Sequence, residues 1–261
     1  MGIHAILAYN SCDAPLIFTF HTFVDDSVYL LFKNEKMQQT VKKFFNKWLK
    51  WYCNKCSCII APSNYVAKRL GRICKRKIEL LPTGIDLYRF EHGNGEKIKA
   101  RWPDKKIILH VGRVVKEKNI DLLIEAAPYI INKIDAIFII VGEGPYKKEL
   151  EEKAKKKNLS NYFIFTGFVS DKELANYYKA ADVFAFPSIY ETQGIVAFEA
   201  MAAGVPVVAA NAKALPDFIK DGENGYLASP YNAKEFADKI LMALEDKGIV
   251  RKAKEFVKEY S

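Results

Sequence analysis

KKIILHVG (105–112) followed by NIDLLIEAAPYI (119–130) decides the fold, because a short apolar run gives way to an amphipathic one. The first run has the composition of a buried strand, and the second has apolar residues at helical spacing, namely Ile120, Leu123, Ile124 and Ala127, which Ile131 just after it continues. The order returns in AIFIIVG (136–142) with YKKELEEKAKKK (146–157), NYFIFTG (161–167) with DKELANYYKAA (171–181), and ADVFAFPS (181–188) with GIVAFEAMAAG (194–204), before VPVVAA (205–210). Strands alternating with helices predict a parallel sheet covered on both faces, so we expect residues 97–261 to form one doubly wound α/β domain.

The first 96 residues follow another pattern. Strands are expected in PLIFTF (15–20), CIIAPS (58–63) and IELLPTGI (78–85), with helices near 34–54 and from Asn64 onward. Three strands make a thin sheet, so residues 1–90 are expected to be part of a second α/β domain. The polar, glycine-containing EHGNGEK (91–97) is the expected linker.

Composition limits the class of protein. With 261 residues, 50% of them hydrophobic and 27% charged, the chain is expected to be globular with a sizeable core rather than disordered. MGIHAILAYNSCD (1–13) has no basic leader region, and no apolar run is long enough to span a bilayer, so we expect a cytoplasmic protein. A net charge of +9 favours anionic partners. Nucleic acid is not expected among them, because no recognition motif accompanies the charge.

The cysteines in CNKCSC (53–58) invite a metal site. No Cys or His follows at zinc-like spacing, the total of five cysteines is odd, and Cys58 falls where a buried strand begins. We therefore expect reduced cysteines and no metal.

A carboxylate lies in an apolar helix within PSIYETQGIVAFEAMAAGVPVV (187–208), where Glu199 is the only charged residue from Gly194 to Ala210. Burying an unpaired charge costs several kcal/mol, so a polar group must meet it. Gly194 at the helix start offers backbone N–H groups, which bind anions well. A carboxylate beside an anion site indicates a nucleotide, with ribose on Glu199 and phosphates at the helix start. The alternative is that Glu199 pairs with a neighbouring Lys or Arg.

Six segments in order resemble one family: LPTGID (81–86), HVGRVVKEKNIDLLIEA (110–126), VGEGP (141–145), FTGFVSDKEL (165–174), the 187–208 segment and DGENGYL (221–227). The chain resembles the nucleotide-binding half of GT-B glycosyltransferases, in particular the retaining glycosyltransferase family 4. The match covers most of residues 58–250. It implies a GT-B fold, with a near-complete Rossmann-like donor domain preceded by a partial Rossmann-like N-terminal domain.

The loop after the first strand of the donor domain is implied to hold the leaving group. Gly112 lets the backbone approach a ligand closely, and Arg113 and Lys118 from the same loop would stabilise the departing nucleoside diphosphate. An ordinary solvent-facing pair is the alternative. Asn119 stands where many relatives have Gly, and we expect it to cap the following helix.

The remaining donor contacts are also implied by the resemblance. Phe168 and Val169, which the resemblance places at the base, could equally be residues that pack in the core. The resemblance assigns the base to Phe168 and Val169, the phosphate to the amides of Gly194 and Ile195, the ribose to Glu199, and the sugar to Glu191, Thr192 and Gln193, with Glu191 in a catalytic role near the anomeric centre.

In the N-terminal part, TFHT (19–22) follows a strand and puts His21 where relatives carry a His beside the reacting sugar. The resemblance implies a catalytic role for His21, with a structural His as the alternative. The predicted helix near 34–54 suits an anionic membrane surface, or else presents a core face with a lysine fringe. Its aromatic and basic residues are Phe44, Phe45, Trp48, Trp51, Tyr52, Lys42, Lys43, Lys47 and Lys50.

The implied function is transfer of a hexose from a nucleotide-diphosphate sugar to a lipid or saccharide acceptor with retention. The sugar nucleotide is a co-substrate, no cofactor is implied, and the protein would lie in the cytoplasm or peripherally at the inner face of the membrane. No DxD-like acidic pair occurs at a strand end of the donor half, which argues against an obligatory metal. No general base is evident, which fits a leaving phosphate that takes the acceptor proton.

Compared with the family, the chain begins well inside the N-terminal half and stops at KEFVKEYS (254–261), so both ends are expected to be missing. Nucleotide-sugar binding is therefore a firmer expectation than turnover. The alternative function is a non-catalytic nucleotide-sugar-binding fragment, or a subunit whose acceptor half another chain completes.

Overall fold

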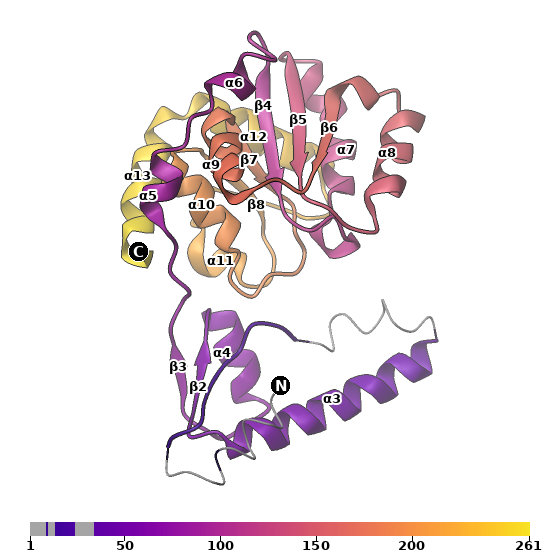
Figure 1. The fold of residues 1–261 in the computed structure, drawn as a ribbon. Helices are drawn as coiled ribbons and strands as arrows, with labels where there is room; N and C mark the ends of the chain where they lie inside the picture. Colours follow the sequence, from indigo (N-terminus) through magenta and orange to yellow (C-terminus); the bar gives the residue numbers. More distant parts are fainter. Residues whose placement is uncertain (1–8, 10–13, 24–33) are drawn as a thin grey trace. The chain divides into compact units, whose positions relative to one another are not determined.

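The computed structural model describes residue 9 and residues 14–23 and 34–261. The chain forms two compact units, Met1–Thr83 and Gly84–Ser261, each drawn as a ribbon in Figure 1.

The C-terminal unit is built on a six-stranded sheet in the order β6-β5-β4-β7-β8-β9. All its neighbouring strands pair in parallel, as the alternation of strands and helices predicts. The strands are β4 (Lys106–Val111), β5 (Ala136–Val141), β6 (Phe163–Gly167), β7 (Val183–Phe186), β8 (Val207–Ala210) and β9 (Tyr226–Ala228).

Helices cover both faces of this sheet, and side chains alternate between two cores (Figure 1). On β4, Leu109 faces one core and Ile108 the other. Because both faces of the sheet are buried, the sequences of its strands are continuous apolar runs. The first core packs against α5 (Leu87–Glu91), α6 (Glu96–Lys99), α9 (Asp171–Ala180), α10 (Ile195–Ala203), α11 (Leu215–Phe218) and α13 (Lys247–Val257). The second packs against α7 (Asp121–Ile131), α8 (Lys147–Lys156) and α12 (Ala233–Glu245).

Three short 3₁₀ helices complete the C-terminal unit: η2 (Lys116–Lys118), η3 (Ser160–Tyr162) and η4 (Lys258–Tyr260). The last of these ties the end of the C-terminal unit to its beginning, because the Ile85 amide donates to the Tyr260 carbonyl over 2.8 Å.

The N-terminal unit has a three-stranded parallel sheet in the order β1-β2-β3. Its elements within the described residues are β1 (Ile17–Thr19), α3 (Glu35–Lys55), β2 (Cys58–Ala61), α4 (Asn64–Gly71) and β3 (Ile78–Leu80). Helix α3 begins where the Asn34 side chain accepts from the amides of Lys36 and Met37, and it buries Leu49, Tyr52 and Cys53. The thin sheet predicted for this part is confirmed.

The units divide between Thr83 and Gly84, ahead of the segment 91–97 expected as the linker. Residues 84–97 pack on the C-terminal unit. Phe90 is buried, and its ring meets Tyr178 edge-on at 5.5 Å. Gly95 lies so close to α9 that a Cβ there would come within 2.4 Å of the Ala180 nitrogen. Glycine in this segment therefore serves close packing and not chain flexibility, and the polar composition of the segment did not reveal that.

Among the described cysteines, Cys53, Cys56, Cys58 and Cys74 are all free thiols. No group of three or more His, Cys, Asp or Glu in the described residues could hold a metal ion. None of the described helices combines the length and the apolar character needed to cross a bilayer.

Candidate functional site

The candidate site lies where the strand order reverses. Strand β4 pairs with both β5 and β7: the chain runs from β4 through β5 to β6 at one edge of the sheet, then crosses back to β7 on the other side of β4. Ligands of open α/β sheets bind beyond the carboxyl ends of the strands at such a point. The loop after β4 carries Gly112, Arg113 and Lys118, and the loop after β7 carries Glu191 and leads to Gly194.

A cleft of about 440 Å³ opens beyond β4, β5 and β6. Phe168 is 81% exposed, so core packing does not account for it, whereas Val169 is half-buried and also packs on the first core. Gly112 and Arg113 share the cleft with this pair, whereas Lys118, Glu191, Gly194 and Glu199 are not among its lining residues. The lining residues are Val111, Gly112, Arg113, Val141, Gly142, Glu143, Phe168, Val169, Asp171 and Leu174.

Backbone forms part of this cleft because two loops meet without side chains between them. At Gly142, which has a φ of 129°, a Cβ would lie 2.0 Å from the Gly112 carbonyl oxygen. The Gly112 amide in turn donates to the Val141 carbonyl over 3.0 Å. The VGEGP segment therefore fixes the position of the Gly112–Arg113 backbone.

Lys118 and Glu191, which the sequence assigns to different parts of the donor, form an ion pair in the structure. Their side chains are only 15% and 13% exposed. The loops that carry them are tied together, since the Ile189 amide donates to the Glu117 carbonyl over 3.0 Å. Lys118 also passes beside Gly112, where a Cβ would lie 3.8 Å from the lysine Cε.

Arg113 has a different environment from Lys118. Its side chain is 76% exposed, and its Nη2 lies 3.8 Å from Oε1 of Glu117. One loop thus supplies a solvent-facing guanidinium that lines the cleft and a largely buried ammonium that lies beside Gly112 but is not among the lining residues. Such a pair suits a diphosphate, because the guanidinium can bind in a bidentate manner and the ammonium acts as a point charge.

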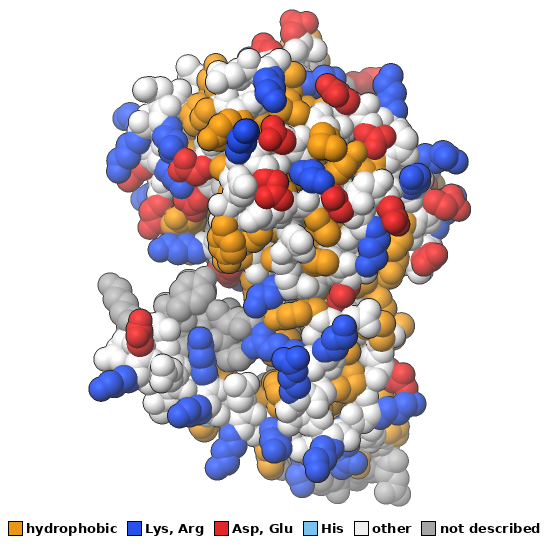
Figure 2. Space-filling view, turned by 180° about the vertical axis from the view of Figure 1, so that it is seen from behind, with side chains coloured by type: hydrophobic (Ala, Val, Ile, Leu, Met, Phe, Trp, Pro, Cys, Tyr) orange, Lys and Arg blue, Asp and Glu red, His pale blue; other side chains and the backbone are white. Residues whose placement is uncertain are grey.

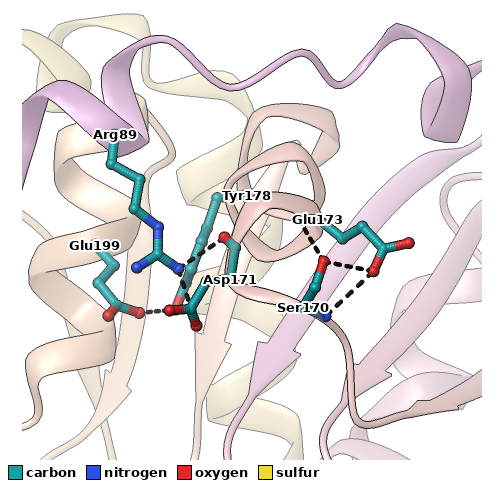
Figure 3. Close-up of polar contacts among 6 residues, drawn as sticks. All are labelled: Arg89, Ser170, Asp171, Glu173, Tyr178 and Glu199. Carbon is teal, nitrogen blue, oxygen red and sulfur yellow. Dashed lines mark hydrogen bonds and ion pairs between the residues drawn. The ribbon is translucent and has the colours of Figure 1, made fainter.

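Within the part of the chain that the structure describes, Glu199 on α10 is met by a hydroxyl group and not by a lysine or arginine hydrogen bond (Figure 3). Tyr178 Oη donates to Glu199 Oε2 over 2.8 Å. Burial raises the pKa of the Glu199 carboxyl, while the Tyr178 hydrogen bond and the Arg89 charge oppose that rise. Arg89 itself donates to the backbone carbonyl of Asp171, a residue of the cleft, over 2.7 Å. Glu199, the residue predicted to bind the ribose, therefore lies in a polar group with Tyr178, Arg89 and Asp171, of which Asp171 lines the cleft.

Gly194 begins α10 in the left-handed region, at a φ of 88°. A Cβ there would come within 2.7 Å of Leu215 Cδ2, so any other residue would both strain the backbone and clash. Among the described residues no side chain caps this helix start. Beside it, Thr192 is half-buried, Gln193 is buried and Ile195 is exposed.

The cap expected at Asn119 is wrong. Asn119 has a φ of 53°, and Ile120 occupies the N-cap position of α7. The Asn119 side-chain amide instead donates to the carbonyls of Pro187 and Pro230, over 3.2 and 2.9 Å. Because the left-handed conformation favours Gly and then Asn, the residue serves the turn and ties it to the loop after β7.

No functional role was predicted for His110 on β4, because a lone His in an apolar strand resembles a core residue. It is fully buried, and burial lowers its pKa to about 4. Its Nδ1 lies 3.0 Å from the Ala185 carbonyl, so the neutral ring donates there. Its Nε2 has no hydrogen-bond partner in the described part of the chain, and it lies 3.7 Å from where a Gly112 Cβ would be.

Tyr178 and Arg89 lie in none of the quoted family segments, and Asp171, although it lies in FTGFVSDKEL, was assigned no role; the three residues meet only through the packing of α5, α9 and α10. One signal was available: Ser170 and Glu173 form a capping box that starts α9 at Asp171 (Figure 3).

His21 lies in the N-terminal unit, two residues beyond β1, and is exposed. The strand before it is therefore confirmed, while its role toward the sugar stays a prediction.

Comparison with known proteins adds to this geometry. The family described as "Glycosyl transferases group 1" matches residues 95–260, and "Glycosyltransferase Family 4" matches residues 1–89. The alpha-monoglucosyldiacylglycerol synthase of Streptococcus pneumoniae is 31% identical over 255 residues, which are 94% of this chain and 56% of that protein. A sulfoquinovosyl transferase of Arabidopsis thaliana is 29% identical over 261 residues, 95% of this chain and 48% of that protein. The chain thus spans about half the length of the curated relatives it matches.

Solved structures match nearly the whole chain. A sucrose-phosphate synthase from Thermosynechococcus elongatus gives a TM-score of 0.82 at 26% identity, covering 99% of this chain and 67% of that one. Anabaena HepE in complex with UDP and glucose gives a TM-score of 0.85 at 22% identity, covering 99% and 71%.

Proposed function

Since the chain belongs to the group 1 glycosyl transferases of glycosyltransferase family 4 and has the GT-B fold, we propose that it binds a nucleotide-diphosphate sugar and transfers the hexose with retention. The observation that carries this proposal is the meeting of Gly112, Arg113, Phe168 and Val169 in one cleft at the reversal of strand order. The exposed Phe168 and the adjacent backbone offer a surface for the base.

Charge supports a diphosphate as the leaving group. Arg113 and Lys118 would bind it, with the amides of Gly194 and Ile195 at the start of α10 taking phosphate oxygens. Glu199 would bind the ribose hydroxyls through the carboxylate that Tyr178 orients. Glu191, Thr192 and Gln193 would contact the sugar, with Glu191 exchanging its Lys118 contact for one with the ligand.

In the proposed reaction the bond between the anomeric carbon and the diphosphate oxygen breaks, and the acceptor oxygen bonds to the same face of that carbon. The acceptor proton passes to the departing phosphate. Arg113 and Lys118 stabilise the negative charge that develops there, which is the largest contribution a site of this kind makes. His21 is proposed to assist at the sugar. No cofactor or metal is included in this proposal.

The acceptor is proposed to be a lipid or a glycan, bound by a protein associated peripherally with a membrane. Relatives named for lipid acceptors support this, among them the phosphatidylinositol monomannoside mannosyltransferase of Mycobacterium tuberculosis, 32% identical over 182 residues, 65% of this chain and 47% of that protein.

A thermal-shift panel of UDP-, GDP- and ADP-sugars tests the donor site, because a ligand that binds the folded state raises its stability by mass action. We expect one base to give a clear shift, and no shift with any donor would contradict the proposal. With that donor, NMR of the product is expected to show the anomeric configuration of the donor; inversion would contradict retention.

The second candidate is nucleotide-sugar binding without transfer, which would need only the donor cleft of the C-terminal unit. Donor binding without steady-state transfer by the purified chain would support this candidate over an independent enzyme.

A further inference from the structure

The positive charge of the chain is concentrated in one unit. Residues 1–83 hold 13 of the 40 Lys and Arg residues but only 5 of the 31 Asp and Glu residues. The remaining residues are therefore almost neutral, although the chain carries +9. In Figure 2, Lys and Arg dominate the charged side chains over the N-terminal unit, in the lower part of the view, whereas both signs alternate over the C-terminal unit. An anionic partner of the N-terminal unit is thus indicated independently of the donor cleft.

Part of this charge surrounds a groove of about 490 Å³ between α3 and α4. Lys47 and Lys50 lie one turn apart on α3, and Arg69 and Arg72 lie one turn apart at the end of α4. The complete described lining is Asn46, Lys47, Lys50, Arg69, Arg72 and Ile73, without a carboxylate among them. Lys47, Lys50 and Arg72 repel one another around this hollow, so the site favours an anion that they can share.

One of the four cations is held in place. The Arg69 guanidinium carbon lies 3.7 Å from the centre of the Phe23 ring, and its Nη1 donates to Tyr65 Oη over 3.4 Å. A stacked guanidinium loses less conformational freedom when it binds a phosphate than a free lysine does.

Aromatic side chains flank the lysines of α3. Phe44 is 66% exposed and Trp51 is 46% exposed. At 100° per residue, Phe44 and Trp51 lie within roughly 60° of Lys47 around the helix and roughly 140° or more from the buried Leu49. Exposed aromatic rings beside lysines are typical of helices that lie in a membrane interface. The exposed rings favour a lipid over a soluble anion, because only a membrane interface would bury them.

We propose that the groove between α3 and α4 binds the phosphate of an anionic phospholipid headgroup, while Phe44 and Trp51 enter the interface beside it. The inference rests on the proposed peripheral membrane association and gives it a defined site. It makes no use of the donor cleft, so the two can fail separately.

Vesicle sedimentation with the full chain tests the site. Vesicles of phosphatidylcholine with phosphatidylglycerol are compared with pure phosphatidylcholine. We expect Lys47→Gln/Lys50→Gln/Arg72→Gln to weaken binding to the anionic vesicles by about tenfold or more, because each basic residue near such a surface contributes substantially. The matched control, Lys36→Gln/Lys55→Gln/Lys75→Gln, removes equal charge from exposed residues of the same unit outside the groove. Equal losses for both triple variants would overturn the groove as a site.

A second pair of measurements separates lipid from free phosphate. Phe44→Ser/Trp51→Ser is expected to weaken vesicle binding at least severalfold. Glycerol phosphate, titrated as the soluble probe, is expected to bind no tighter than millimolar. Tight binding of this probe with vesicle binding unaffected by the aromatic change would overturn the lipid assignment. Nucleotide-sugar thermal shifts, measured on every variant, report the donor site and folding; an unchanged shift with lost vesicle binding supports the inference even if no transfer is found.

Discussion

At the scale of single residues, the Lys118–Glu191 ion pair sets a condition on donor binding, because a diphosphate that binds Lys118 competes with a carboxylate. Replacing Glu191 by Gln should remove that competition. We expect Glu191→Gln to bind a nucleoside diphosphate about 1 kcal/mol more tightly, the scale of a partly screened ion pair, while sugar transfer slows. Calorimetric titration measures the affinity, with Glu151→Gln on α8 as a distant control. Weaker or unchanged binding would show that the pair does not restrain Lys118.

Glu199 and Tyr178 allow the ribose contact to be separated from packing. Glu199→Ala should weaken nucleotide binding by about 1.5 to 3 kcal/mol, because a hydrogen bond to a charged group is lost. Tyr178→Phe keeps the carboxylate and removes only the hydroxyl that donates to it, so a smaller loss is expected. Isothermal titration of both variants checks this order. Unchanged affinity in Glu199→Ala would exclude the ribose assignment.

His110 gives a pH dependence with a definite sign. Burial holds its folded pKa at about 4, below the unfolded value of about 6.5, so the unfolded chain binds the proton more readily. Its contribution to stability is complete above pH 6.5 and declines as the pH falls toward 4, by up to about 3 kcal/mol. Urea unfolding of the wild type and of His110→Asn between pH 7 and pH 4 should show a shallower decline in the variant. Parallel curves would contradict the assignment.

At the scale of elements, the loops after β4 and β5 depend on glycine for their contact. Gly142→Ala should lower the free energy of unfolding by about 2 kcal/mol or more and weaken nucleotide binding, because its Cβ would collide with the Gly112 carbonyl. Gly222 is the matched control. It also has a positive φ, of 75°, but a Cβ there meets nothing within 4 Å. If both substitutions prove equally mild, the close approach is not what fixes the cleft.

The elements themselves were largely predictable, and their contacts were not. Apolar runs and helical spacing locate β4, α7 and β5, because burial on both faces leaves a strong pattern. The contact of Tyr178 with Glu199 depends on how α9 meets α10, which no local pattern encodes. Asn119 shows the same limit. Its residue type favours a helix cap, but in the structure it takes a left-handed backbone conformation in the loop after β4 and donates to Pro187 in the loop after β7.

At the scale of the whole molecule, the two units should differ in local stability. A three-stranded sheet buries few contacts, so backbone amides of residues 14–23 and 34–83 should exchange with solvent much faster than those of residues 105–245. Hydrogen exchange followed by mass spectrometry measures this on the intact chain. A nucleoside diphosphate should slow exchange in the loops after β4 and β7. Uniformly slow exchange over both units would show that the N-terminal unit is as stable as the other.

The domain boundary was predictable only approximately. Polar and glycine-rich composition pointed to residues 91–97, but Phe90 anchors the preceding helix to the C-terminal unit, and the division falls before Gly84. Composition reports how soluble a segment is, whereas the boundary depends on which core receives the apolar side chains that precede it, Ile85, Leu87 and Phe90.

The glycine contact between the loops also bears on inhibition. Where Gly112 and Gly142 line the cleft, a ligand meets main-chain atoms. A side chain introduced at Gly142 would collide with the Gly112 backbone and displace it. A compound that takes its affinity from these backbone atoms would leave few routes to resistance. A point mutation that weakens such a compound there would also disturb the loop that carries Arg113, so escape and loss of donor binding would coincide.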